Sequence, residues 1–340
     1  MTRRIPALTL VALAAATSLL ALAACGGDDG SSDSITVYSG RSEDLIAPLI
    51  ERYKEDTGAD VEVRYGDTAE LAGTIREEGP NSPADLFFSQ DAGALGALEK
   101  DDLLTELPGD ITDEVDPRFR SRDDRWVATS ARARVVAYNR DQVQRSELPD
   151  SILGFTDERW NGRIGWAPTN GSFQAFVTAL RELRGDDVAR EWLEGIVAND
   201  PEVFDDNEPI RDAIAAGELD VGFINHYYVA QAQAEEGPDY PVEVHFPPGG
   251  DPGSLVNVAG VGILESSESK EEAERFIRFM LSREAQEYFA RETKEYPLAA
   301  GVEADRRLVP LEDIQQPDID LSNLDDLQGT LRMIEEAGAL

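Results

Sequence analysis

The chain has 340 residues, of which 41% are hydrophobic, enough for one large or two ordinary folded domains. Its formal net charge is −37 at pH 7, with 68 acidic side chains against 31 basic ones. A charge this negative argues against nucleic acid and anionic lipid surfaces as partners, because both carry the same sign. It favours cations in a general way, although most of the charge is expected on solvated surface.

The first residues have the pattern of an export signal. A short basic region precedes an apolar run over 7–20, which is short for a membrane span. Small residues then lead to Cys25, the only cysteine, in an arrangement that resembles a bacterial lipobox. We predict a lipoprotein signal peptide over 1–24, lipidation of Cys25 and a flexible tether over 25–34. The body would then be extracytoplasmic and anchored to the outer face of the cytoplasmic membrane. The alternative is an ordinary signal peptide with a chance cysteine.

Strand and helix patterns alternate over the first part of the body. Apolar runs at 35–39, 61–65 and 84–89 predict strands, and apolar residues at helical spacing follow each run. Short connections between such elements indicate a doubly wound sheet with parallel strands. Ligands of these sheets bind at the carboxyl ends of the strands, which here include the segments 39–42 and 89–91.

A second α/β pattern begins near Trp126. The sequence predicts an extended segment over 127–139 and strands over 164–166 and 219–224. Helices are predicted between these strands. Two α/β units on one chain predict a cleft between two lobes.

Two adjacent tyrosines lie where a predicted strand meets a predicted helix. Tyr227 and Tyr228, preceded by Asn225 and His226, follow the strand at 219–224. Neighbouring side chains at a helix start diverge by only about 100°, so both hydroxyls can reach one centre. A phenolate is a hard anionic oxygen ligand that suits a hard trivalent cation. For a bare Tyr-Tyr pair, ordinary aromatic packing is the alternative, and His226 is expected to pack or cap more often than it ligates.

Polar residues at helix starts form candidate anion sites. Asn170, Gly171 and Ser172 precede a predicted helix, where backbone N–H groups and a small glycine suit an anion. Asn207 stands at another helix start. Asparagine and serine are also common N-caps, so each signal is weak by itself.

Two further residues are candidates by position. Arg41 follows the first strand and could pair with an anion or, as arginines more often do, with an acidic neighbour. Tyr138 ends a strand and could converge on the same cleft or belong to the core.

Motifs for enzyme chemistry are missing from the sequence. It has two histidines, no nucleophile elbow of the Gly-x-Ser-x-Gly type, no phosphate-binding Walker loop and no dinucleotide fingerprint. An extracellular phosphoester enzyme is a third hypothesis, but it lacks a recognisable nucleophile. We therefore predict a binding protein, not an enzyme.

Taken in order, segments over residues 35–300 resemble bacterial ferric-iron-binding proteins of ABC importers. The segment that ends in Asn225-His226-Tyr227-Tyr228 is the most specific. The others are Val37-Tyr38-Ser39-Gly40-Arg41, Pro83 to Phe88, Ala167 to Phe173, Gly260 to Leu264, and Glu271 to Leu281 with Glu284 to Ala290.

The resemblance implies an α/β fold of the periplasmic-binding-protein type, with two lobes joined by crossover strands around a ligand cleft. Lobe 1 would comprise 35–128 and about 258–300, lobe 2 about 129–257, and 301–340 would be a helical tail packed on one lobe. The cargo would be Fe3+, delivered by a monomer to an ABC permease.

The resemblance also implies a ligand set. Tyr227 and Tyr228 would ligate ferric iron, with Tyr138 as a third ligand in the position of some members. A synergistic anion, carbonate or phosphate, would sit at the cradle whose members are Asn170, Gly171 and Ser172, assisted by Asn207, Asn225 and Arg41.

The chain departs from one branch of that family at two ligand positions. Ser42 stands where that branch has a histidine, and Gln90 where it has a glutamate. The remaining ligands are therefore open: water, Asp91 or an anion held by Arg41 could complete the shell. Whether the cargo is Fe3+, Fe2+ or a chelate is open as well. The alternative function is a binding protein for another solute, such as an organic or phosphorylated anion.

Overall fold

The computed structural model describes residues 34–299 and 301–340. Cys25, the predicted signal peptide and nearly all of the predicted tether lie outside the described residues. Within the described ranges, no helix is long and apolar enough to cross a membrane.

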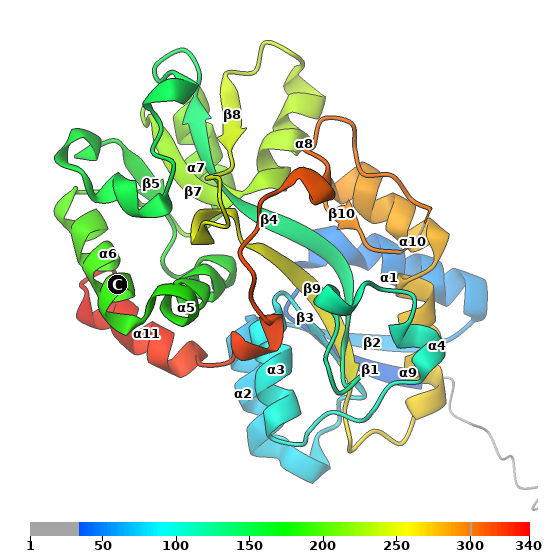
Figure 1. Ribbon diagram of the computed structural model, residues 1–340. Helices are drawn as coiled ribbons and strands as arrows, with labels where there is room; N and C mark the ends of the chain where they lie inside the picture. The colour runs from blue at the N-terminus through cyan, green and yellow to red at the C-terminus, as the bar shows by residue number, and fades with distance from the viewer. Residues whose placement is uncertain (1–33, 300) are drawn as a thin grey trace, which may run out of the picture. The chain divides into compact units, whose positions relative to one another are not determined.

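The described strands pair into one mixed sheet in the order β2-β1-β3-β9-β4-β7-β5-β6, with β8 and β10 also paired to β4 (Figure 1). The strands are β1 (Ser34–Ser39), β2 (Asp60–Tyr65), β3 (Leu86–Ser89), β4 (Val127–Asn139), β5 (Ile164–Trp166), β6 (Glu202–Val203), β7 (Val221–Asn225), β8 (Val242–His245), β9 (Val256–Ile263) and β10 (Tyr296–Pro297). The helices are α1 (Glu43–Thr57), α2 (Thr68–Glu78), α3 (Ala92–Lys100), α4 (Gly109–Thr112), α5 (Gly171–Arg184), α6 (Asp186–Ala198), α7 (Asn207–Ala216), α8 (His226–Glu236), α9 (Lys270–Met280), α10 (Arg283–Tyr288) and α11 (Leu327–Glu336).

The two ends of this sheet form two lobes, as the sequence predicts. In lobe 1, β1 pairs in parallel with β2 and β3, and α1, α2, α3 and α9 pack around them (Figure 1). In lobe 2, β5 pairs in parallel with β6 and β7, and α5 to α8 surround them. The helices bury apolar faces at helical spacing: Ile46, Leu49, Ile50 and Tyr53 are the buried residues of α1.

The strand β4 connects the two lobes. All 13 of its residues are buried, which fits a strand covered on both faces. Its residues 127–133 pair with β9 on the lobe 1 side, whereas residues 134–138 pair with β7 on the lobe 2 side. The extended segment predicted at 127–139 is therefore the principal crossover between the lobes.

The C-terminal tail contacts both lobes, whereas the sequence predicts packing on one. A short 3-10 turn, η9 (Leu321–Asn323), packs on α3 of lobe 1, and α11 packs on α5 and α6 of lobe 2. Lys100 on lobe 1 pairs with Asp325 at 2.7 Å, and Arg181 on lobe 2 pairs with the next residue, Asp326, at 2.8 Å.

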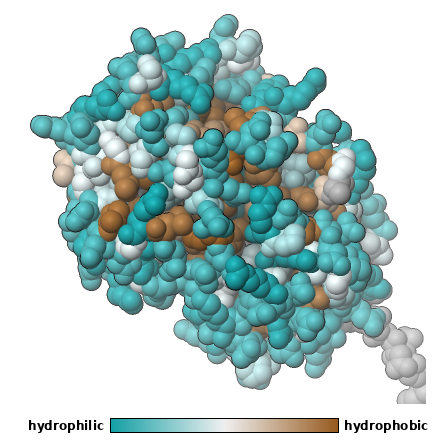
Figure 2. All heavy atoms as spheres, viewed as in Figure 1, coloured by the Kyte–Doolittle hydropathy of each residue, from teal (hydrophilic) through white to brown (hydrophobic). Residues whose placement is uncertain are grey.

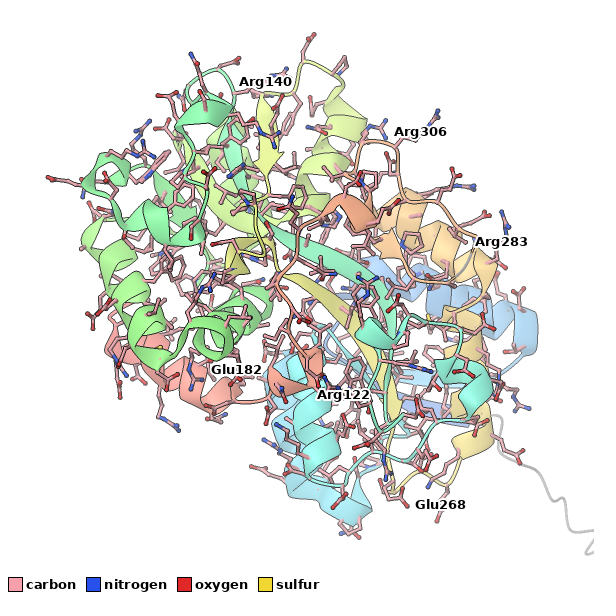
Figure 3. All side chains as sticks on the ribbon, viewed as in Figure 1. Arg122, Arg140, Glu182, Glu268, Arg283 and Arg306 are labelled. Carbon is pink, nitrogen blue, oxygen red and sulfur yellow. The ribbon has the colours of Figure 1, made fainter. Side chains whose placement is uncertain are left out.

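Charged residues cover the surface, as the composition predicts. Figure 2 shows a mostly hydrophilic exterior, with hydrophobic residues gathered over the middle of the face in view. Arg140 and Arg283 extend from the periphery (Figure 3). Arg122 lies beside the tail and pairs with Asp320 at 2.9 Å.

Close backbone contact between α3 and η9 makes Gly96 sensitive to substitution. A Cβ at Gly96 would lie 2.4 Å from the carbonyl oxygen of Ser322. We expect Gly96→Ala to lower the free energy of unfolding by about 1–3 kcal/mol, because backbone must move to relieve the overlap. Urea unfolding followed by circular dichroism measures the change.

Gly73→Ala in α2 is the matched control, because a Cβ there would meet nothing within 4 Å. It should leave stability unchanged or raise it by up to about 1 kcal/mol, since alanine is the better helix former. Equal losses in both variants would contradict the packing argument.

Candidate functional site

A pocket of about 270 Å3 lies where loops of lobe 1 face helix starts of lobe 2. Its lobe 1 side follows the carboxyl ends of β1, β2 and β3, where α/β sheets bind ligands. It brings together six of the predicted residues: Arg41, Asn170, Gly171, Ser172, Tyr227 and Tyr228. Residues that complete its lining are Gly40, Ser42, Leu45, Tyr65, Gly66, Asp67, Thr68, Gln90 and Asp206.

The paired tyrosines lie at the junction that the sequence predicts. The strand β7 ends at Asn225, α8 begins at His226, and the rings of Tyr227 and Tyr228 have centroids 4.3 Å apart. Tyr227 is 1% exposed, and its hydroxyl has no hydrogen-bond partner in the described part of the chain. A buried hydroxyl without a partner is destabilising unless a ligand satisfies it.

Burial makes both phenols harder to ionise. It raises the pKa of Tyr227, with a further contribution from the Glu295 carboxylate. It also raises the pKa of Tyr228 well above its ordinary value, with a further contribution from a charge on Tyr227. A bound cation would reverse this balance, because its charge stabilises the phenolate.

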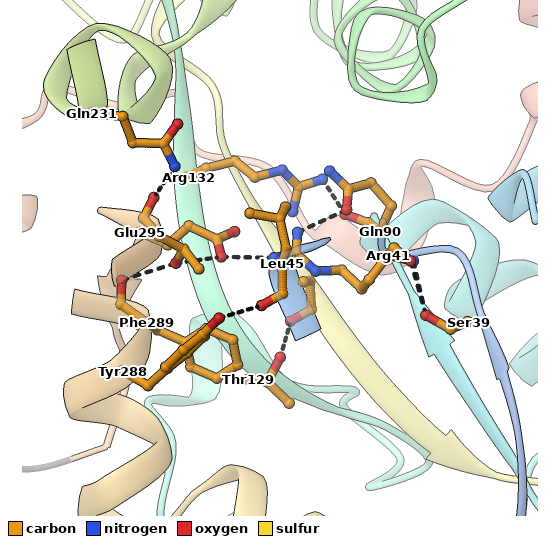
Figure 4. Close-up of polar contacts among 12 residues, drawn as sticks. Ser39, Arg41, Leu45, Gln90, Thr129, Arg132, Gln231, Tyr288, Phe289 and Glu295 are labelled. Carbon is orange, nitrogen blue, oxygen red and sulfur yellow. Dashed lines mark hydrogen bonds and ion pairs between the residues drawn. The ribbon is translucent and has the colours of Figure 1, made fainter. Parts of the chain in front are cut away.

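Two buried arginines of β4 lie near these phenols. Arg132 and Arg134 are two residues apart, so their side chains leave the strand on the same face. Arg134 donates to the carbonyl oxygen of Phe223 at 2.6 Å. Arg132 donates to the carbonyl oxygen of Gln90, and its Nε and Nη1 have no partner among the described residues (Figure 4).

The proximity of these charges affects their protonation. Burial, then the charge of Arg132, lowers the pKa of Arg134 to about 9. Burial, then the charge of Arg41, lowers the pKa of Arg132. Both pKa values are shifted upward in part by Tyr227, so a phenolate there and the arginine charges stabilise each other.

Arg41 is held by a buried ion pair. Its Nη2 lies 2.7 Å from Glu295 Oε2, and both side chains are fully buried. Its Nη1 donates to Gln90 Oε1 at 2.7 Å (Figure 4). Thr293 Oγ1 donates to Glu295 Oε2 at 3.0 Å. Of the two partners weighed for Arg41, the structure shows the acidic neighbour.

The predicted anion cradle is capped by its own asparagine. Asn170 Oδ1 accepts from the backbone N–H of Ser172 at 3.0 Å and of Phe173 at 3.4 Å. Its Nδ2 donates to Asp206 at 3.1 Å. An anion at the start of α5 must therefore compete with the Asn170 carboxamide for these N–H groups.

Asn207 and Asn225 lie behind the pocket lining instead of in it. Asn207 Oδ1 accepts from the backbone N–H of Asn225 at 3.1 Å and from Arg134 Nη1 at 3.4 Å. Asn225 Oδ1 accepts from the same Nη1 at 3.3 Å. Their side chains fix the end of β7 and the position of Arg134, so the prediction that they contact an anion needs correction.

Tyr138 is also misplaced by the sequence prediction. It pairs with Val221 at the far end of β7, whereas Arg134 pairs with Asn225 at the pocket end. Its hydroxyl donates to Glu243 at 2.8 Å, and burial together with that carboxylate raises the pKa of Tyr138 to about 12. The register of β4 therefore places Tyr138 outside the pocket, in the core of lobe 2.

His226 packs edge-on against Tyr227, with ring centroids 5.9 Å apart, and does not line the pocket. Its Nδ1 accepts from the backbone N–H of Ala133 at 3.1 Å, and its ring stacks on Tyr296 at 4.6 Å. Burial lowers the pKa of His226 to about 3, so the ring is neutral. The packing interpretation of this histidine is the one that the structure shows.

Sequence reasoning missed three residues of the pocket lining, Tyr65, Asp67 and Asp206, and the buried Arg132 near Tyr227. Tyr65 and Asp67 follow the second predicted strand, and the strand-end rule that selected Arg41 applies equally to them. An arginine inside a long buried strand is a second signal, because arginine is seldom buried without a purpose. Among the described residues, no group of three His, Cys, Asp or Glu side chains could hold a metal.

Comparison with known proteins assigns the class. Residues 81–321 match the family described as bacterial extracellular solute-binding protein, and the chain belongs to it. That family comprises transport binding proteins, not enzymes.

Relatives with ferric-iron names match over nearly the full length. The chain is 33% identical to the major ferric iron-binding protein of Neisseria meningitidis serogroup B, over 98% of this chain and 97% of that one. It is 31% identical to the Fe(3+)-binding periplasmic protein of Serratia marcescens, over 99% of each chain. The crystal structure of iron-bound HitA from Pseudomonas aeruginosa is similar with a TM-score of 0.84 and 32% identity, covering 90% of this chain and 99% of that one.

The buried pair Arg41–Glu295 generates a stability prediction. Glu295→Ala should lower the free energy of unfolding by about 3–5 kcal/mol, because it leaves the Arg41 charge buried without its partner. Glu284→Ala removes a carboxylate from the pair with Arg52, whose side chains are 47% and 49% exposed. That control should change stability by at most about 1 kcal/mol. Urea unfolding of the apo protein measures both changes. Similar losses of unfolding free energy in the two variants would refute the distinction between the buried and the exposed ion pair.

Proposed function

We propose that this chain captures ferric iron through the phenolates of Tyr227 and Tyr228 for import into the cell. The observation that carries the proposal is the adjacent phenols of a buried Tyr227, whose hydroxyl is unpartnered, and a partly buried Tyr228, at a pocket between two lobes. Relatives of nearly equal length are named for ferric-iron binding, which supports the same cargo here.

The chemistry of the pocket suits a trivalent cation. Phenolate oxygens are hard anionic ligands, and a trivalent ion can displace protons from phenols of raised pKa. The arginine charges at Arg41 and Arg132 lower the pKa of Tyr227 in part, and so favour its phenolate once the cation has displaced the proton. Exclusion of water on closure would strengthen each of these interactions.

We further propose that a synergistic anion such as carbonate or phosphate can share the site. Two phenolates leave one positive charge on Fe3+, and Arg41 with the start of α5 offers further donors near the lining. A solved structure from Trichodesmium that is 29% identical contains iron together with citrate. An anion bound here would displace the Asn170 carboxamide oxygen from the backbone N–H groups of Ser172 and Phe173.

Visible absorption during titration with ferric citrate tests the cargo and its ligands together. The purified body should develop a phenolate-to-iron charge-transfer band, with bicarbonate or phosphate added in parallel series. Tyr227→Phe/Tyr228→Phe should abolish the band, because both ligating oxygens are gone. Tyr138→Phe is the matched control and should keep it, since that hydroxyl bonds Glu243 outside the pocket.

No band under any anion would contradict ferric binding and favour a different solute. The buried arginines would then suit an organic or phosphorylated anion. The structure of AfuA from Actinobacillus pleuropneumoniae with fructose-6-phosphate shares the fold, with a TM-score of 0.76 and 16% identity. Isothermal titration with sugar phosphates would be the next measurement.

We propose delivery to an ABC permease by a monomer anchored through lipidated Cys25. In cells lacking the wild-type chain, Cys25→Ala should release the protein from the membrane fraction and lower uptake of radioactive ferric iron. Loss of the anchor dilutes the carrier away from the permease, which reduces encounters. Membrane retention with normal uptake would refute both the anchor and its role.

A further inference from the structure

We propose that the loop after β2 supplies the lobe 1 ligands of the metal, through the hydroxyl of Tyr65 and the carboxylate of Asp67. This inference rests on the proposed function and deepens it. It assigns the half of the coordination shell that Ser42 and Gln90 leave open.

The loop is fixed beside the pocket by the sheet and by α2. Tyr65 is the last residue of β2 and pairs in register with Ser39, and the backbone N–H of Gly66 donates to the carbonyl oxygen of Ser39 at 3.1 Å. Asp67 is the N-cap of α2. Both side chains line the same pocket as Tyr227 and Tyr228 but come from the opposite lobe.

A glycine allows the loops after β1 and β2 to approach each other. A Cβ at Gly40 would lie 1.9 Å from Thr68 Oγ1. That hydroxyl donates to the carbonyl oxygen of Gly40 at 3.4 Å and accepts from the backbone N–H of Gln90 at 3.2 Å. Thr68 thus joins the three lobe 1 loops, which holds its neighbour Asp67 at the edge of the pocket.

Both proposed ligand oxygens are available. In the described part of the chain, the hydrogen bonds to the Asp67 carboxylate use Oδ1, from the backbone N–H of Ala69 at 2.8 Å and Glu70 at 3.2 Å. This leaves Oδ2 for a ligand and fixes its direction. No hydrogen bond engages the Tyr65 hydroxyl within the described ranges, and this side chain is half-buried.

The other residues on the lobe 1 side of this pocket cannot supply an anionic ligand. Arg41 is a cation, and the Gln90 carboxamide oxygen accepts from it at 2.7 Å. Ser42 is a neutral hydroxyl, and Leu45 is apolar. Among the lining residues of lobe 1, Tyr65 and Asp67 are therefore the two that carry or can acquire negative charge.

Charge counting gives this inference a distinctive consequence. Fe3+ with the two phenolates of lobe 2 keeps one positive charge, which the Asp67 carboxylate neutralises while Tyr65 binds through its neutral hydroxyl. Asp206, the carboxylate on the lobe 2 side, keeps its charge but is oriented by three hydrogen bonds at Oδ1 from Asn170 and Asn207, so Asp67 is the carboxylate that lobe 1 contributes. An anion can then share the wild-type site without being required for binding, whereas a chain without the Asp67 charge should depend on one.

The test uses Tyr65→Phe and Asp67→Asn in the purified body, with affinity measured by competition against citrate. Asparagine is as good an N-cap as aspartate, so Asp67→Asn removes the charge and keeps the cap. Each variant should lose at least about tenfold in ferric affinity, as ligand-shell changes do. Bicarbonate should restore part of the loss in Asp67→Asn and have little effect on the wild type. Tyr65→Phe should also shift the charge-transfer band.

Two controls separate ligation from general electrostatics and from folding. Glu70→Gln removes one charge from the exposed first turn of α2, outside the pocket lining. Tyr38→Phe removes a hydroxyl that donates to Glu78 at 3.1 Å. Both controls should bind like the wild type, and all four variants should keep the wild-type circular dichroism and melting temperature.

The outcomes distinguish this inference from the proposed function. A wild-type band that depends on Tyr227 and Tyr228, together with wild-type affinity in Tyr65→Phe and Asp67→Asn, would overturn the inference alone. Absence of any band in the wild type would overturn the proposed function and the inference with it. Equal losses of ferric affinity in Asp67→Asn and Glu70→Gln would show that only the net charge matters. That result would also overturn the inference that Asp67 ligates the metal.

Discussion

Buried positive charge on β4 is the constraint around which the pocket is arranged. Arg132 and Arg134 lie at the point where the strand changes partners from β9 to β7, deep between the lobes. An arginine charge at such depth requires partners that compensate for lost hydration. Arg134 obtains them from carbonyl and carboxamide oxygens at the end of β7, which fixes the strand end from which the tyrosines follow. Arg132 is left with two unpartnered nitrogens near Tyr227.

The paired phenols and the arginines therefore form a site that is incomplete without a ligand. At neutral pH the phenols are protonated, and burial raises their pKa values further above the ordinary one. The arginine charges are then balanced by few buried carboxylates, chiefly Glu295. A trivalent cation that converts both phenols to phenolates places negative oxygens beside the arginines and satisfies the Tyr227 hydroxyl at the same time. Cation binding and charge compensation are thus coupled in one place.

Local pattern was sufficient for most of the fold but not for every site residue. The strand-to-helix junction at Tyr227 and Tyr228 was predictable because hydrophobic period and a terminal glycine define both elements. The position of Tyr138 was not predictable, because its distance from the pocket depends on the register in which β4 pairs with β7. A change of that register by an even number of residues leaves the pattern of inward and outward side chains unchanged. The prediction that Asn207 and Asn225 contact an anion was wrong for a related reason. In the sequence, an asparagine at a helix start has the same pattern whether its side chain contacts a ligand or a buried arginine.

The tail adds a constraint on how the pocket can open. Asp325 and Asp326 are adjacent residues, about 3.8 Å apart along the backbone, yet they pair with opposite lobes through Lys100 and Arg181. Leu324 and Leu327 line a small pocket together with Asp67 and Gly171, next to the site. The lobes cannot separate at this end of the cleft without breaking these contacts, although each exposed ion pair is weak.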